Sequence, residues 1–158
     1  MDKWDKRFIN IAKEVSTWSK DPSTKVGAVI VSPDKDIVAT GYNGFPRGIH
    51  DNENDYDNRE LKYKKVVHAE MNAIIRSKRD LTGHTLYVYP IQCCSNCAAC
   101  IIQSGIKRIV SLDTNHVLKD SFILANEMFN EAGIEVILYK ASEYNKIIPN
   151  YDEGGYCC

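Results

Sequence analysis

The second half of the chain alternates short β-type runs with helix-type segments, and this alternation constrains the fold more than any other feature. The runs "TLYVY" (85–89), "RIVSL" (108–112) and "EVILYK" (135–140) are apolar and rich in β-branched and aromatic residues. Between them, "CSNCAACIIQSG" (94–105) and "SFILANEMFNEAG" (121–133) carry apolar residues at helical spacing. Strands and helices in this order favour parallel neighbours in a sheet that helices cover.

The first half of the chain adds two helices and a hairpin to this pattern. Apolar residues recur at helical spacing from Trp4 to Trp18, and "HAEMNAIIRSK" (68–78) predicts a second helix. The runs "VGAVIVS" (26–32) and "DIVATGY" (36–42) are joined by a "SPDK" turn and predict a hairpin of buried strands. The polar stretch 50–65 is expected to be a surface excursion that packs little. The sequence therefore predicts an α/β fold, a three-layer α/β/α sandwich with about five strands.

Length and charge limit the classes of function. The 158 residues suit one domain, 1–158, with a loose tail at about 145–158 that ends in Cys157 and Cys158. Twenty Lys and Arg against 21 Asp and Glu give a net charge of -1, which disfavours a nucleic-acid partner and favours a small molecule. No run of eighteen apolar residues and no signal-peptide pattern is present, so we expect no membrane association and a cytoplasmic, soluble protein. In that compartment clustered cysteines are more often metal ligands or catalytic groups than disulfides.

Three short stretches carry the chemistry when they are taken together: "HAE" (68–70), "CSNC" (94–97) and "GYNGFPRG" (41–48). Each is weak by itself, because C-x-x-C also fits structural zinc, a redox pair or chance, and a lone His or first-turn Glu is usually structural. One imidazole and two thiolates supply three protein ligands for a tetrahedral zinc ion, with the fourth position open to water as in catalytic sites. Glu70 is then available as the acid and base.

Local geometry sets one condition on this site. Cys94 and Cys97 are three residues apart at a helix start, so they face one side, where the positive helix end favours thiolates. His68 and Glu70 diverge by about 200° on an ideal helix. They can serve one metal only if the first turn of their helix is not regular.

The order H-x-E then C-x-x-C is the signature of zinc nucleobase deaminases, and within them the chain resembles the deoxycytidylate (dCMP) deaminases. The resemblance extends from about Asp21 to Ile137, and the loop "GYNG" with its following Pro and Gly is its most specific part. The stretches that carry it are "DPSTKVGAVIV", "GYNGFPRG", "HAEMNAI", "TLYV", the cysteine pair, "IIQSGIKRIV" and "FNEAGIEV". It implies a cytidine-deaminase-like sandwich and hydrolytic deamination of dCMP to dUMP and ammonia, a step that feeds thymidine nucleotide synthesis.

The resemblance also implies roles for the cysteines. Counting back from "QSGI" assigns Cys94 and Cys97 as zinc ligands with His68, and Cys100 as a core residue. Cys93 stands where the family has Pro, and the stretch before Cys94 is one residue longer than in the family, so Cys93 is the alternative ligand to Cys94. Between His50 and His68 the chain has no further Cys or His that could hold a second, structural zinc, which predicts one Zn²⁺ per chain.

Substrate and effector contacts are assigned by the same resemblance. The backbone at Ala69 is expected to hydrogen-bond the base and Asn43 the sugar, while the family's nucleotide pocket is shaped by Thr24, Lys25 and Val26. Family members are commonly homohexamers that dCTP activates and dTTP inhibits. The expected effector residues are Asn43, Gly44, Phe45 and Arg47.

Four other interpretations remain. Cys94, Cys97 and Cys100 fit the start of a ferredoxin cluster, but the fourth cysteine and its Pro are absent, and "HAE" is left unexplained. A non-catalytic zinc-containing nucleotide sensor would not need Glu70. A deaminase could instead act on dCTP or another cytosine nucleotide, or on a base in tRNA, which the near-zero net charge disfavours.

Overall fold

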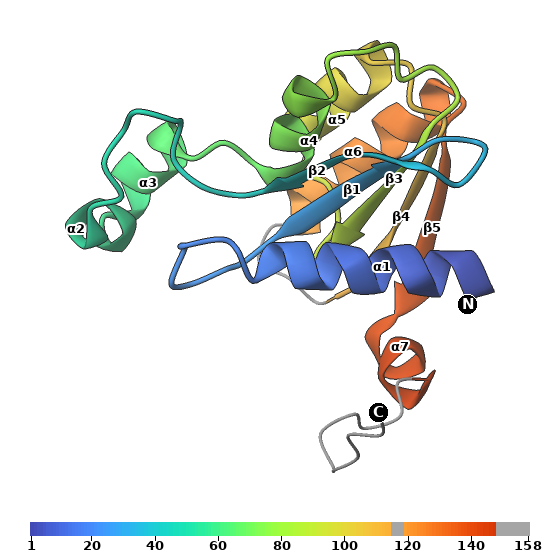
Figure 1. The fold of residues 1–158 in the computed structure, drawn as a ribbon, viewed down its shortest axis with the longest axis horizontal. Helices are drawn as coiled ribbons and strands as arrows, with labels where there is room; N and C mark the ends of the chain where they lie inside the picture. The colour runs from blue at the N-terminus through green and yellow to red at the C-terminus, as the bar shows by residue number, and fades with distance from the viewer. Residues whose placement is uncertain (115–118, 148–158) are drawn as a thin grey trace, which may run out of the picture.

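The computed structural model describes residues 1–114 and 119–147, and its centre is a five-stranded mixed sheet (Figure 1). The strand order is β2-β1-β3-β4-β5. β1 pairs antiparallel with both β2 and β3, whereas β3, β4 and β5 are parallel neighbours. The strands are β1 (Gly27–Val31), β2 (Ile37–Tyr42), β3 (Thr85–Tyr89), β4 (Arg108–Asp113) and β5 (Glu135–Lys140). The parallel half is the half in which the sequence alternates strand and helix.

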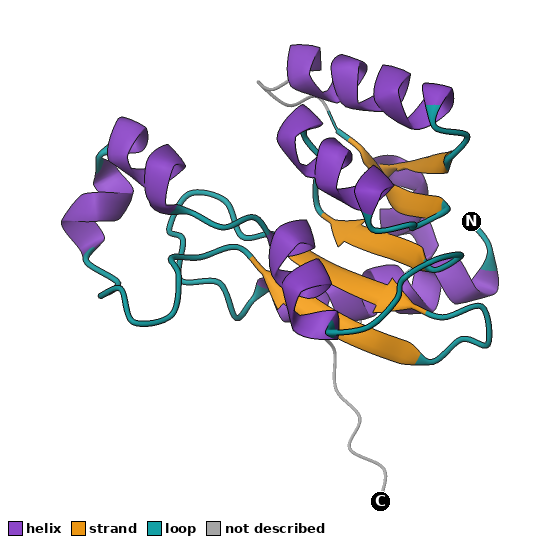
Figure 2. Ribbon diagram, turned by 90° about the horizontal axis from the view of Figure 1, so that it is seen from above, coloured by secondary structure: helices purple, strands orange, loops and turns teal. Residues whose placement is uncertain are grey.

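Helices cover the sheet on both faces (Figures 1 and 2). One face carries α4 (Ala69–Ser77), α5 (Ser95–Gln103) and α6 (Lys119–Glu131), whose apolar residues share a core cluster with the sheet. The other carries α1 (Lys3–Ser16), with Phe8, Ile9 and Ala12 in a second cluster that includes Tyr144 of α7 (Ala141–Ile147). The predicted three-layer α/β/α sandwich is confirmed.

Two glycines of the hairpin let a helix approach the sheet closely on each face. A Cβ atom at Gly41 would lie 2.2 Å from the carbonyl oxygen of Ala69 and 2.4 Å from the amide nitrogen of Ala73 in α4. A Cβ atom at Gly27 would lie 2.0 Å from the carbonyl oxygen of Ala12 in α1. Since no real Cβ atom tolerates such distances, glycine at 41 fixes how near the start of α4 lies to the sheet.

Residues 50–65 form an arm that stands away from the sheet (Figure 1). It contains two short helices, α2 (Glu53–Asp57) and α3 (Arg59–Lys65), each capped by an asparagine side chain. The expectation that this stretch packs little is wrong at two positions. The Tyr56 ring stacks on Phe45 with centroids 4.2 Å apart, and Lys62 is buried in an ion pair with Asp21.

The chain ends beyond the described part of the structure. α7 occupies 141–147, so it takes in the first residues of the predicted loose tail. Residues 148–158, with Cys157 and Cys158, lie outside the described residues. Within the described residues, no helix combines the length and apolar character that crossing a membrane requires.

Candidate metal centre and substrate pocket

The starts of two helices bring the predicted ligands together. His68 directly precedes α4 and has extended backbone angles, φ −69° and ψ 155°. Cys94 directly precedes α5 with φ −78° and ψ 165°. Because His68 is not part of the helix, the divergence of about 200° expected on an ideal helix does not apply. His68 and Glu70 can therefore serve one site.

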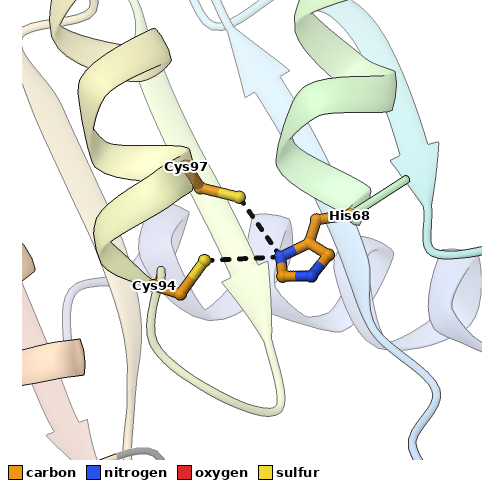
Figure 3. Close-up of side chains that lie close together, drawn as sticks. All are labelled: His68, Cys94 and Cys97. Atoms are coloured by element: carbon orange, nitrogen blue, oxygen red, sulfur yellow. Dashed lines mark hydrogen bonds between the residues drawn. The ribbon is translucent and has the colours of Figure 1, made fainter. Parts of the chain in front are cut away.

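The three ligand atoms have the spacing of a metal centre (Figure 3). His68 Nδ1 lies 3.4 Å from Cys94 Sγ and 3.3 Å from Cys97 Sγ, and all three atoms are within 4.8 Å of one another. A tetrahedral zinc ion with ordinary Zn–N and Zn–S bonds separates nitrogen from sulfur by roughly 3.5 Å. The donor set and its spacing therefore fit zinc. Over residues 1–114 and 119–147, no second group of three such donors is found.

The electrostatics of this cluster suit a cation. A hydrogen bond from Cys97, together with one from His68, lowers the pKa of the Cys94 thiol to about 4 although burial opposes this. The pKa of Cys97 is raised, first by its hydrogen bond to Cys94 and then by burial. Hydrogen bonding to Cys94 likewise raises the pKa of His68. One thiolate thus forms readily beside a thiol, and a coordinated cation deprotonates both.

Glu70 lies in the first turn of α4 and is only 3% exposed. Burial raises the pKa of its carboxyl group, and the neighbouring His68 only partly opposes the shift. Cys93 is also buried and hydrogen-bonds the Glu70 side chain, and burial keeps the pKa of this thiol well above its ordinary value. Cys93 is not part of the three-ligand group, and half-buried Cys100 is not part of it either.

A pocket joins the cluster to most of the predicted substrate residues. His68, Glu70 and Cys94 line it, together with Thr24, Val26, Asn43 and Ala69. Lys25 is exposed and does not line this pocket; it borders a separate surface hollow beside Trp18.

The side chain of Asn43 organises one wall of the pocket. Its Oδ1 accepts from the amide of Val26 at 2.8 Å, and its Nδ2 donates to the carbonyl oxygen of Thr24 at 2.9 Å and to Asp21 at 3.3 Å. Both amide hydrogens are thereby used, and one lone pair of Oδ1 remains for a ligand.

Sequence reasoning missed several residues of the pocket. Its lining also includes Asp21, Ser23, Lys62, Tyr63, Val66, Ile91, Gln92 and Phe122. Lys62 belongs to a run of lysines in a polar stretch, so no local pattern distinguished it from an exposed charge. Asp21 stands in the quoted "DPST" stretch but has the composition of an ordinary turn.

A second hollow adjoins the first. Gly44, Phe45 and Arg47 line it with Asn43, which borders both spaces. Lys20 and Arg76 add positive charge to this hollow. Arg76 lies over the Tyr42 ring at 5.0 Å, and Lys20 pairs with Asp51 at 2.7 Å. The predicted effector residues thus share one hollow.

Comparisons with known proteins define the class of protein to which this chain belongs. Residues 2–113 match the family model described as the cytidine and deoxycytidylate deaminase zinc-binding region. A human deoxycytidylate deaminase is 35% identical over 94% of this chain and 86% of its own length. An uncharacterized deaminase of Aliivibrio fischeri is 46% identical over 86% of this chain and 93% of its own length.

Solved structures agree with these relatives. A dCMP deaminase of the cyanophage S-TIM5, crystallised with dCMP and dUMP, superposes with a TM-score of 0.68 at 26% identity. The match covers 87% of this chain and 98% of that one. The chain belongs to the cytidine and deoxycytidylate deaminase family. The predicted family and its class of hydrolytic deaminase are confirmed.

Proposed function

We propose that this protein is a zinc-dependent dCMP deaminase that converts dCMP and water to dUMP and ammonia. The observation that carries the proposal is that one pocket contains the His68 and Cys94 ligands, the buried acid Glu70 and the polar wall at Thr24 and Asn43. The relatives named deoxycytidylate deaminases, and the phage enzyme crystallised with dCMP and dUMP, support the choice of substrate.

The ligand cluster and Glu70 divide the chemistry between them. His68, Cys94 and Cys97 would hold one zinc ion, which when bound lowers the pKa of water from 15.7 to about 7 and so supplies a nucleophile at neutral pH. Glu70 takes one proton from the water as its oxygen bonds to carbon 4 of cytosine, and delivers that proton to ring nitrogen 3. It then moves the remaining hydroxyl proton to the amine, the bond from carbon 4 to nitrogen breaks, and ammonia leaves as the carbonyl of dUMP forms. Burial raises the pKa of this carboxyl group above its ordinary value, which suits a group that must both gain and lose a proton.

The pocket walls orient the nucleotide for this transfer. Ala69 and Asn43 both line the pocket, which supports a contact of the Ala69 backbone with the base and of the free lone pair of Asn43 Oδ1 with a sugar hydroxyl. Val26 and Thr24 complete the wall that Asn43 holds in place. Orientation of this kind lowers the barrier because the reacting atoms no longer need to be brought together from solution.

The direct test is turnover by the purified, zinc-loaded protein. dCMP, dCTP, deoxycytidine and CMP are supplied separately, and ammonia release and loss of cytosine absorbance are followed. We expect turnover of dCMP, one zinc per chain by elemental analysis, and retention of zinc by Cys93→Ser but not by Cys94→Ser. Turnover of dCTP alone would reassign the substrate, and no turnover by zinc-loaded protein would favour a nucleotide sensor.

We propose in addition that dCTP activates and dTTP inhibits the enzyme at the second hollow, in a homohexamer. The support is the loop of Asn43, Gly44, Phe45 and Arg47, which borders both spaces, and the cations Lys20 and Arg76, which suit a triphosphate. Regulation requires the two effectors to favour different states of the assembly. A dCMP saturation curve that dCTP leaves unchanged, or a monomer by sedimentation, would refute this.

A further inference from the structure

The α3 arm contributes a buried lysine to the substrate pocket. Lys62 is the buried residue of α3; its neighbours Glu60, Tyr63 and Lys64 are exposed. The Lys62 side chain is 10% exposed and reaches the polar wall of the pocket. Among the described residues that line this pocket, Lys62 is the single Lys or Arg. Burying an ammonium group is costly, so a lysine directed inward from an otherwise exposed helix points to a function.

The partners of Lys62 hold its ammonium group at the polar wall of the pocket. Its Nζ lies 2.8 and 2.7 Å from the two oxygens of Asp21 and also donates to the Ser23 hydroxyl. Asp21 accepts four other hydrogen bonds: from the amide and hydroxyl of Ser23, from the amide of Thr24 and from Asn43 Nδ2. The carboxylate therefore keeps four hydrogen-bond donors if the ammonium group turns toward a second anion.

Once the base and the sugar of the nucleotide are assigned, the pocket wall that contains Lys62 remains for the phosphate. The reacting base has to lie against Glu70 and the ligand cluster, and Asn43 and Ala69 are assigned to sugar and base. The side-chain donors that remain in the pocket include the ammonium of Lys62, the hydroxyls of Thr24 and Tyr63 and the amide of Gln92, and Lys62 is the one that carries a positive charge. Lys25, expected from the sequence to serve the nucleotide, is exposed outside this pocket.

We propose that Lys62, with the hydroxyl of Thr24, binds the 5′-phosphate of the substrate and selects a nucleotide over a nucleoside. The inference rests on the proposed deaminase function, which it deepens. Lys62 acts in binding and touches no reacting atom, so its loss weakens recognition and leaves proton transfer intact.

The test is Lys62→Gln, with Lys64→Gln as the matched control, because Lys64 is an exposed lysine of the same helix that pairs with exposed Glu60. We expect Lys62→Gln to reduce kcat/KM for dCMP by about 100-fold, mainly through KM, as for loss of one partner of a buried charged contact. Deoxycytidine turnover should stay at the wild-type rate, and Lys64→Gln should behave as wild type. An equal loss for dCMP and deoxycytidine would identify Lys62 as merely structural and overturn the proposal. A large effect of Lys25→Gln with none at Lys62 would also overturn it.

Binding of dUMP and deoxyuridine by calorimetry separates this proposal from the proposed function, because it needs no turnover. We expect Lys62→Gln to lose about 100-fold in dUMP affinity and none in deoxyuridine affinity. This result in a protein that deaminates nothing would refute the deaminase and support the phosphate contact. Lys62→Gln leaves Asp21 as a buried charge without its cation, so the double variant Asp21→Asn/Lys62→Gln serves if the single variant fails to fold. Unchanged dUMP affinity in either folded variant would overturn the proposal.

Discussion

A carboxyl group is buried on each face of the central sheet, and the surroundings shift the pKa values of the two groups in opposite directions. Asp5 of α1 is 1% exposed and Glu70 of α4 is 3% exposed. Asp5 receives two hydrogen bonds from Arg108, both 2.8 Å, and one each from Tyr87 and Tyr139 at 3.0 and 2.8 Å. Burial acts to raise the pKa of Asp5, but these donors outweigh it and the pKa is lowered. For Glu70 burial dominates and the pKa is raised.

The difference separates an acid that stabilises the fold from an acid suited to chemistry. The donors around Asp5 keep it charged, and they join α1 to β3, β4 and β5. Glu70 accepts a hydrogen bond from the Cys93 thiol, a weak donor, and it lines the pocket. A group that must gain and lose a proton cannot be held in one charge state by many partners.

Replacing Glu70 by Gln should have the largest effect on activity. We expect kcat for dCMP to fall by about 10²- to 10⁴-fold, because the proton carrier is lost. The free energy of unfolding should not decrease, since a neutral amide replaces an acid whose burial is unfavourable. Steady-state kinetics and urea unfolding of the zinc-loaded variant measure the two quantities. A destabilised but active variant would remove the distinction between the two acids.

Asp5→Asn should have the opposite signature. Loss of the charge leaves Arg108 without its buried partner, and breaking such a pair costs about 3–5 kcal/mol of unfolding free energy. The kcat of the folded fraction should stay at the wild-type value. Glu135→Gln is the control: Glu135 is the other, 62% exposed, partner of Arg108, and its loss should cost less than about 1 kcal/mol. A reduced kcat in folded Asp5→Asn would contradict the separation.

Gly27 and Gly41 allow the same comparison between helices α1 and α4, because each glycine lies against one of them. We expect Gly41→Ala and Gly27→Ala each to cost about 1–3 kcal/mol, since both force a helix away from the sheet. Gly41→Ala should also lower zinc retention and kcat, because the displaced backbone includes Ala69, next to His68. Gly27→Ala should change stability alone. Equal losses of zinc in the two variants would contradict this.

The pH dependence of stability should show the smallest effect. The pKa of Asp5 is lower in the folded than in the unfolded chain, so its contribution is present above the unfolded value near 4 and is lost as the pH falls toward the folded value. One group changes the unfolding free energy by at most about 1.4 kcal/mol per pH unit. Urea unfolding between pH 5 and pH 3 should therefore decline less steeply for Asp5→Asn than for wild type. Identical slopes would exclude Asp5 as the titrating group.

Most of the fold could be predicted from the sequence because its signals are local. The periods of the apolar residues identified strand 85–89, the hairpin and helices α1, α4, α5 and α6, and Gly105 follows the end of α5 with positive φ. Helices α2, α3 and α7 were not predicted. The family and the cysteines of the candidate metal centre were identifiable because a zinc site requires fixed residue types at fixed spacing. Lys62 and Tyr56 could not be predicted, because both lie in a polar stretch whose local pattern indicates solvent exposure.

The sequence by itself determined the order of elements, the residues able to hold a metal, and the acid beside them. Only the tertiary structure decided that His68 precedes its helix in an extended conformation, so that its ring meets two cysteines 26 and 29 residues later. It also decided which lysine is buried in the pocket and which acid is held charged. The physical reason is that burial, pKa and charge pairing depend on residues distant in sequence, such as Asp21 with Lys62 and Asp5 with Arg108. No local pattern encodes those pairs.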